Sequence, residues 1–186
     1  MVAAAVDPES LVFVDEMGVH TSLAPIYGYA APRGERLRLS VPRNRGKNTT
    51  TLLLSSMTTS GMGPSLAVEG ASTAQVFETY IEKMLVPMLH AGQIVVMDNL
   101  GAHKPRRIRE LIEGQGCELL YLPSYSPDYN PIEEALSKIK RFLREVGARS
   151  RGALVEALGA ALGAISPEEA RGYFEHAGYC SIGQLL

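Results

Sequence analysis

The chain has few of the side chains that build zinc sites or disulfide frameworks. Its 186 residues include two cysteines, four histidines and no tryptophan. Cys117 and Cys180 lie far apart, and neither has a second cysteine or a histidine at metal-binding spacing. The sequence therefore predicts neither a structural zinc site nor a disulfide-stabilised secreted domain, and it fits a reducing cytoplasm.

Long apolar runs are also lacking. The longest, such as residues 11–14 and 93–97, are far shorter than the roughly 20 residues of a membrane span. Residues 1–10 lack the basic start and apolar stretch of an export signal. A chain of this length with 46% hydrophobic residues is expected to form one domain. We predict a cytoplasmic protein without a membrane segment, with a core at about residues 10–146 and a helical extension at about 150–186.

Charge is nearly balanced, and the net value of −2 argues mildly against nucleic acid as a partner. However, sixteen of the eighteen lysines and arginines fall in three clusters, at residues 33–47, 104–109 and 138–151. Solvated surface explains any one cluster, whereas three together are compatible with a phosphate-binding face. For His103, capping of the following helix is a competing role. The candidate DNA-binding residues are Arg33, Arg36, Arg43, Arg45, Lys47, His103, Lys104, Arg106, Lys138 and Arg141.

Apolar, β-rich runs predict five strands. The second and third form a hairpin, and the Pro-, Gly- and Arg-rich segment 24–48 before them is a loop or a frayed edge strand. Strand and helix alternate from residue 93 onward, which predicts parallel pairing and an α/β fold. The predicted strands are residues 11–16, 49–57, 63–70, 93–98 and 117–122.

Apolar residues at helical spacing predict five helices. Ser72 and Gln75 predict a capping box for the first helix, and Pro87 predicts a bend near its end. The predicted helices are residues 72–88, 104–116, 132–146, 151–164 and 167–176.

Aspartate is scarce, with four residues against sixteen glutamates, so its positions are informative. Asp15 and Asp98 each end a predicted strand, and Glu133 or Glu134 opens the helix after the fifth strand. If the first and fourth strands are parallel neighbours, their carboxyl ends bring both aspartates to one edge of the sheet. Three carboxylates there suit two hard cations, Mg²⁺ or Mn²⁺, held about 3.5–4 Å apart.

Each acid also has a local structural explanation. Asp15 fits a turn at a strand end, and Asp98 fits an Asx-turn. In "NPIE", Asn130 is a good N-cap and Glu133 is the third helical residue of a capping box. On local grounds the capping role of Glu133 is the better supported one, so the residues taken singly leave both alternatives open.

Four segments in order resemble the signature blocks of one family. They are "FVDEMGVH", "YGYAAPRGER", "VVMDNLGAHK" and "LPSYSPDYNPIEEALSKIK", and they look like the catalytic domain of mariner-superfamily transposases from bacterial insertion sequences. Asp98 and Glu133 are separated by 34 residues (133 − 98 − 1), the separation typical of that superfamily. The resemblance covers roughly residues 10–146.

The resemblance implies a ribonuclease-H-like α/β fold, a mixed five-stranded sheet flanked by helices. It implies that Asp15, Asp98 and Glu133 form the metal-binding triad, with Glu134 as the alternative third acid. The implied chemistry is hydrolysis at transposon ends and attack of the freed 3′-hydroxyl on target DNA, commonly at TA. The implied partners are DNA and a second subunit, in a homodimer or a transpososome, with nucleoid association when DNA is bound.

One family feature is not expected here. Family members carry an N-terminal helix-turn-helix region, and only about ten residues precede the first predicted strand. This pattern predicts a catalytic half, which could be one frame of a split gene, a truncated remnant or an isolated fragment. Two other functions stay open: a nuclease such as a junction resolvase on the same fold, and a remnant that binds DNA or a partner transposase without cutting.

Overall fold

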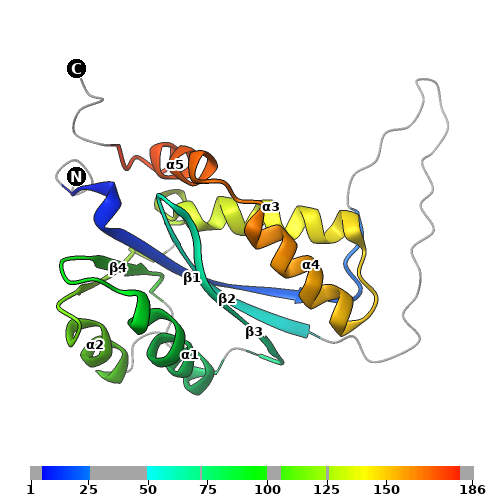
Figure 1. Cartoon of the computed structure of the whole chain (residues 1–186), viewed down its shortest axis with the longest axis horizontal. Coiled ribbons are helices and arrows are strands. Elements are labelled where there is room, and N and C mark those ends of the chain that lie inside the picture. The colour runs from blue at the N-terminus through cyan, green and yellow to red at the C-terminus, as the bar shows by residue number, and fades with distance from the viewer. Residues whose placement is uncertain (1–5, 26–49, 72, 100–105, 125, 181–186) are drawn as a thin grey trace.

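A five-stranded sheet forms the centre of the computed structural model, which describes residues 6–25, 50–71, 73–99, 106–124 and 126–180 (Figure 1). The strand order is β3-β2-β1-β4-β5. All five predicted strands are present, although the first runs on beyond its predicted end at residue 16. The strands are β1 (Leu11–His20), β2 (Thr50–Thr58), β3 (Gly61–Glu69), β4 (Ile94–Met97) and β5 (Glu118–Tyr121).

The sheet is mixed, with an antiparallel half and a parallel half. β2 pairs antiparallel with both β1 and β3, whereas β4 pairs parallel with both β1 and β5. The β2–β3 hairpin closes at the pair Thr58 and Gly61. Gly61 has a φ of 119°, a conformation that glycine adopts without steric cost. Both the predicted hairpin and the predicted parallel pairing are therefore confirmed.

Helices cover both faces of the sheet, α1 and α2 on one face and α3, α4 and α5 on the other (Figure 1). The five predicted helices are confirmed, and the helical path near Pro87 changes type rather than simply bending. No helix in the described ranges is both long enough and apolar enough for a membrane crossing. The helices are α1 (Ala74–Tyr80), the π-helical turn η3 (Ile81–Leu85), the 3-10 turn η4 (Val86–Met88), α2 (Arg106–Glu113), α3 (Pro131–Val146), α4 (Arg151–Gly163) and α5 (Pro167–His176).

The start of α1 differs from the prediction by one residue. The N-cap is Thr73, whose hydroxyl accepts a hydrogen bond from the Val76 N–H at 3.3 Å. The N-cap is thus Thr73 and not the predicted Ser72, and the predicted pair of Ser72 and Gln75 involves a residue outside the described ranges. Serine and threonine are both good N-caps, so the local sequence could not choose between these neighbours.

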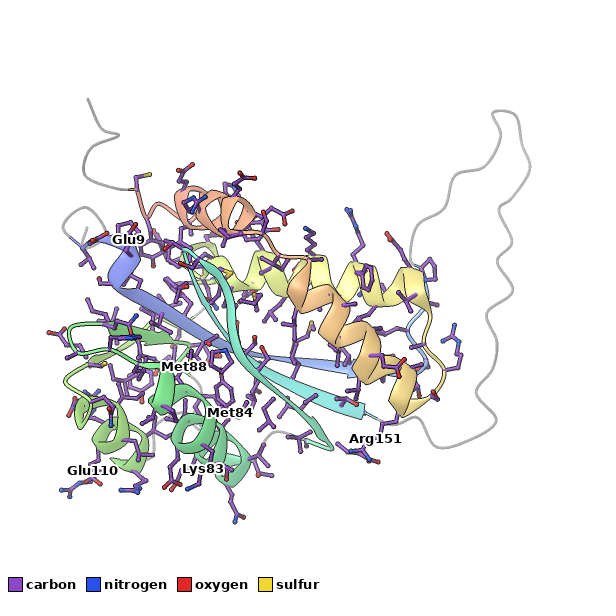
Figure 2. All side chains as sticks on the ribbon, in the orientation of Figure 1. Glu9, Lys83, Met84, Met88, Glu110 and Arg151 are labelled. Carbon is purple, nitrogen blue, oxygen red and sulfur yellow. The ribbon has the colours of Figure 1, made fainter. Side chains whose placement is uncertain are left out.

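Both faces of the sheet are apolar, as expected where helices cover both sides. Along β1, Phe13 and Met17 pack under α3, α4 and α5, whereas Val12 and Val14 pack under α1 and α2. This alternation follows from the two-residue period of a strand. Charged side chains such as Lys83 and Glu110 point away from the sheet (Figure 2).

α5 is fixed both to the sheet and to the turn before α3. Phe174 is buried and meets Phe13 of β1 edge to face, with ring centroids 5.3 Å apart. Tyr179, which follows α5, also packs against Phe13 with its ring tilted, and its hydroxyl donates a hydrogen bond to the Tyr129 carbonyl oxygen at 2.8 Å. Tyr129 ends the 3-10 turn η6 (Pro127–Tyr129). The last helix therefore supports the segment that leads into α3.

Candidate active site

Strand register brings the two aspartates together. The parallel pairing of β1 with β4 ends at Val14 and Met97. The residue that follows each of these two is an aspartate: Asp15 follows Val14 within β1, and Asp98 follows Met97 directly after β4. Because side chains alternate along a strand, Asp15 lies on the same face as Phe13, under α3 to α5. The first and fourth strands are therefore parallel neighbours, as predicted.

Asp15 is buried, with 8% of its surface exposed. Its Oδ1 accepts a hydrogen bond from the Glu16 N–H at 2.7 Å, and its Oδ2 accepts one from the Asn130 side-chain amide at 2.8 Å. Burial raises the pKa of Asp15 to about 7, and the negative charges of Asp98 and Glu133 act in the same direction. This carboxyl group therefore lies close enough to two other acids to sense their charge.

The sequence predicted that the first strand ends at Asp15, but β1 continues beyond this residue. β1 continues because β2 remains paired with it as far as His20 and Thr50, well beyond the last pair with β4. Asp15 itself pairs with Ser55 of β2. The alternative of a strand-end turn at Asp15 is therefore wrong. What ends beside Asp15 is the neighbouring strand β4, whose last pair with β1 is Met97 with Val14.

Glu133 lies in the first turn of α3 and borders three hollows of the surface. One, of about 370 Å³, lies between the ends of β4 and β5 and the start of α3, and its lining includes Asp98, Asn130 and Glu133. A second, of about 230 Å³, is lined by Asp15, Glu133 and Lys140 among others. The third, of about 530 Å³, is lined by Glu133, Glu134 and His176 among others. Glu133 is thus the acid shared by the hollow beside Asp98 and the hollow beside Asp15.

Glu134 faces α5 instead. Its Oε1 is 2.7 Å from Nδ1 of His176, the last residue of that helix. This hydrogen bond and the charge of Glu134 raise the pKa of His176 above its ordinary value. Both glutamates line the hollow of about 530 Å³, but Glu134 pairs with His176 there, whereas Glu133 also borders the hollows beside the two aspartates.

The predicted capping box at α3 is not formed. Asn130 occupies the N-cap position, but its side chain makes no capping hydrogen bond, because the amide is directed to Asp15. The Asn130 N–H donates to the Pro127 carbonyl oxygen at 2.8 Å, and the Glu133 N–H donates to the Asn130 carbonyl oxygen at 3.1 Å. The capping alternative for Glu133 is therefore wrong, and its carboxylate is not needed to start the helix.

The donor chemistry fits a hard divalent cation. Asp15, Asp98 and Glu133 offer only carboxylate oxygens, which suit Mg²⁺ or Mn²⁺ better than zinc. The raised pKa of Asp15 reflects a buried carboxyl group next to like charges, and a cation would remove that penalty. Within the described ranges, no three acidic, histidine or cysteine side chains already enclose a metal position. These three acids would therefore have to adjust in order to bind an ion.

Comparison with protein families decides the assignment. A family profile described as "DDE superfamily endonuclease" matches residues 10–154. The chain belongs to this DDE superfamily. No protein with a curated description matches it.

Solved structures of Mos1 transposase share the fold of this DDE domain. The Mos1 paired-end complex with the left transposon end is 20% identical, with a TM-score of 0.73, and the match covers 91% of this chain and 52% of that one. The catalytic domain of Mos1 mariner transposase is 19% identical, with a TM-score of 0.64 and coverages of 92% and 79%. The chain thus spans about half of the Mos1 protein in the first complex, and the predicted ribonuclease-H-like fold is confirmed.

The metal in related crystals agrees with the donor chemistry of the DDE domain. A Mos1 mariner paired-end complex with Mn is 20% identical to this chain, with a TM-score of 0.71 and coverages of 91% and 53%. A second paired-end complex contains Mg. Divalent metal ions therefore accompany this fold in a related protein.

Most predicted DNA-binding residues of the DDE domain lie outside the described residues. Of the three within them, Arg106 and Arg141 are highly exposed and pair with Glu110 and Glu145 on their own helices. Lys138 instead pairs with Glu169 of α5 and lies 3.4 Å from the Ala164 carbonyl oxygen, which gives it a structural contact. The predicted residues outside the described ranges are Arg33, Arg36, Arg43, Arg45, Lys47, His103 and Lys104.

Two residues of the site were not singled out from the sequence, although Lys140 falls in the predicted basic cluster at residues 138–151. Lys140 borders the hollow beside Asp15 and Glu133. It follows Glu133 by seven residues, or two helical turns, and this spacing could have indicated it. Asn130 was predicted only as a cap, and no local signal indicates a bond to a residue 115 positions away.

Proposed function

We propose that this chain is the catalytic domain of a metal-dependent DNA transposase. Asp15, Asp98 and Glu133 would hold two divalent cations, Mg²⁺ or Mn²⁺. The observation that carries the proposal is the parallel register of β1 and β4, which ends at the two aspartates beneath the helix of Glu133. Membership of a DDE endonuclease family and the fold shared with Mos1 transposase support it.

The three acids have distinct tasks in this proposal. When bound, the cations would activate a water or a 3′-hydroxyl as nucleophile and stabilise the leaving oxygen of a phosphodiester. Asp15 is the rigid ligand, because two hydrogen bonds already fix its carboxylate. Asp98 and Glu133 border the hollow of about 370 Å³ and would complete the ligand set. Glu134 is not a ligand in this scheme, because His176 engages it.

Cationic side chains would hold the DNA backbone. Lys140 borders the hollow beside two of the acids, so its ammonium group can reach a phosphate close to the reacting bond. Arg106 and Arg141 are exposed at 92% and 79% of their side-chain surface and could neutralise phosphates farther away. Such contacts give affinity that falls steeply with salt and carries little sequence information. A second subunit, in a homodimer or a larger transpososome, would bring two DNA ends together.

Two DNA reactions test the proposal. The first is nicking of a supercoiled plasmid in Mg²⁺ or Mn²⁺, and the second is joining of a labelled duplex with a free 3′-hydroxyl to that plasmid. Both are expected with the wild-type chain. Asp98→Asn should lose both by more than about a hundredfold, since even residues that only support metal ligands typically contribute about 10–100-fold.

The outcome separates the transposase from its two rivals. Nicking without joining would indicate a nuclease or resolvase on the same fold. Binding of the plasmid without either reaction, in both metals, would indicate a non-catalytic DNA-binding protein. Equal activity of Asp98→Asn and the wild type would contradict the site itself. Circular dichroism of both proteins shows whether the variant is folded.

A further inference from the structure

Asn130 has an unusual role for a residue at the start of a helix. It is buried, with 4% of its surface exposed, and it stands directly before α3 in the N-cap position. Asparagine is preferred there because its side-chain oxygen accepts a hydrogen bond from the first helical N–H groups. Here the side chain makes no such bond. Its amide instead donates to Oδ2 of Asp15 at 2.8 Å.

The start of α3 is secured without that side chain. Pro131 is the first helical residue and has no N–H to satisfy. The Glu133 N–H donates to the Asn130 carbonyl oxygen, and the Asn130 N–H donates to Pro127. The main chain of the turn therefore supplies these bonds, which leaves the Asn130 amide for a contact across the fold.

The backbone that carries this amide is held from outside the turn as well. The carbonyl oxygen of Tyr129, the preceding residue, accepts the hydroxyl hydrogen bond of Tyr179 at 2.8 Å. Tyr179 in turn packs on Phe13, two residues before Asp15. Asn130 and Asp15 are thus connected twice, once directly and once through the aromatic contacts behind them.

We propose that Asn130 is a positioning residue of the active site, whose amide ties the Asp15 carboxylate to the first turn of α3 and thereby fixes its position relative to Glu133. This inference rests on the proposed metal-dependent function. The Glu16 N–H and the Asn130 amide each occupy one oxygen of Asp15. A carboxylate has about four lone-pair sites, so each oxygen keeps capacity for a cation while the group cannot rotate.

Three single variants separate positioning from capping. Asn130→Ser keeps a good N-cap residue, but its side chain is too short to replace the amide. Asn130→Ala removes both the capacity to cap the helix and the amide that reaches Asp15. Ser150→Ala is the matched control, because Ser150 caps α4 by accepting from the Ala153 N–H and is not among the residues that line the two hollows beside the aspartates. For each protein we would measure the Mn²⁺ concentration that half-saturates plasmid nicking, Mn²⁺ binding by calorimetry, and the melting temperature.

The positioning role predicts that Asn130→Ser and Asn130→Ala behave alike. In each variant, the Mn²⁺ concentration that half-saturates nicking should be at least about tenfold higher than in the wild type, within the range typical of residues that support metal ligands. Each variant should also bind Mn²⁺ correspondingly more weakly. Ser150→Ala should lower the melting temperature and leave the Mn²⁺ dependence unchanged. A wild-type Mn²⁺ dependence in Asn130→Ser, with a defect only in Asn130→Ala, would overturn the proposal in favour of capping.

A stability cycle keeps this test independent of catalysis. The unfolding free energies of Asn130→Ser, Asp15→Asn and the double variant report whether the two side chains interact. If the wild type neither binds nor uses Mn²⁺, the proposed function fails, and non-additive stabilities would still establish the tie between the two residues. Additive stabilities would overturn the tie itself, whatever the activity.

Discussion

The two faces of the sheet are packed with the same kinds of residue, but in the described part of the chain only one face contains a buried charge. Under α1 and α2, the fully buried side chains of Phe77, Ile81 and Ile108 close an apolar layer. Under α3 to α5, Phe13 and its neighbours form an equally apolar layer. Asp15 interrupts this second layer and is the one charged residue classed as buried in the described part of the chain.

This difference indicates how a stable fold accommodates a reactive site. A buried carboxylate costs free energy unless it is paired, and here the cost is confined to the place where β4 ends beside β1. Among the described residues, the opposite face buries no charged side chain and can serve stability alone. Substitutions on the two faces should therefore separate activity from stability, and the expected effects can be ranked.

The largest contrast should come from neighbouring residues of α3. Glu133→Gln is expected to reduce DNA cleavage by more than about a hundredfold, because Glu133 borders both aspartates. Glu134→Gln should retain cleavage, because Glu134 faces His176. Cleavage rates in Mn²⁺ and melting temperatures of both variants check this. Full activity of Glu133→Gln would remove that residue from the site, and loss of activity in Glu134→Gln would make it the third acid.

The second contrast compares one buried phenylalanine from each face. Phe77→Leu and Phe174→Leu should each lower the free energy of unfolding by about 1–3 kcal/mol, since both side chains are almost fully buried. Only Phe174→Leu should also lower cleavage per folded molecule, because Phe174 packs on Phe13, two residues from Asp15. Urea unfolding gives the folded fraction, and equal specific activities would show that the two faces do not differ in this respect.

The third effect has the opposite sign, because Asp15→Asn should stabilise the metal-free protein. Folding raises the pKa of Asp15 from its ordinary value of 3.8 to about 7. The folded state therefore favours the protonated acid, and wild-type stability falls as pH rises from about 4 to about 7. Asparagine does not ionise, but it loses one acceptor, so the net gain at pH 8 is about 1–2 kcal/mol.

This gain should disappear near pH 4, where Asp15 is largely protonated in the fold and begins to protonate in the unfolded chain. Urea unfolding at pH 4 and pH 8 without divalent ions measures the difference. Adding Mn²⁺ at pH 8 should then stabilise the wild type and leave Asp15→Asn unchanged. A variant less stable than the wild type at pH 8 would mean that burial does not penalise this carboxylate.

The smallest effect concerns the exposed pair of Glu134 and His176. Because Glu134 raises the pKa of His176 in the fold, the pair stabilises the protein fully below the ordinary histidine pKa of 6.5. This stabilisation is lost as pH rises through the higher folded pKa. The melting temperature of Glu134→Gln should therefore lie slightly below that of the wild type at pH 5.5 and equal it at pH 9. A difference that persists at pH 9 would exclude histidine protonation as its cause.

Sequence patterns predicted the sheet and the acids because these depend on short-range information. Two patterns were enough to predict that Asp15 and Asp98 lie close together. One is a buried strand that ends in an acid, and the other is the alternation of strands and helices, which predicts parallel pairing. The patterns could not predict that β1 continues past Asp15, because this depends on pairing with the distant β2. They also favoured a cap for Asn130, since N-cap preference is local and its bond to Asp15 is not.

The contacts of α5 could not be predicted from the sequence either, because they join residues that are far apart along the chain. Lys138 belongs to a basic cluster, but Glu169 lies 31 positions away and gives it a structural partner. The different contacts of Glu133 and Glu134 likewise depend on where the fold places His176. Composition and spacing could name the candidate side chains, but only the packing of α5 determines which of them it engages.

The docking of α5 separates two boundaries that are often treated as one. The family profile ends at residue 154, within α4, whereas Phe174 and Tyr179 complete the aromatic cluster behind Asp15. The stretch that the profile matches is therefore shorter than the stretch that packs around the sheet. A fragment cut where the profile ends would keep Asp15, Asp98 and Glu133 and lose the aromatic support behind Asp15. The limit of a family profile is therefore not a safe place to truncate this domain.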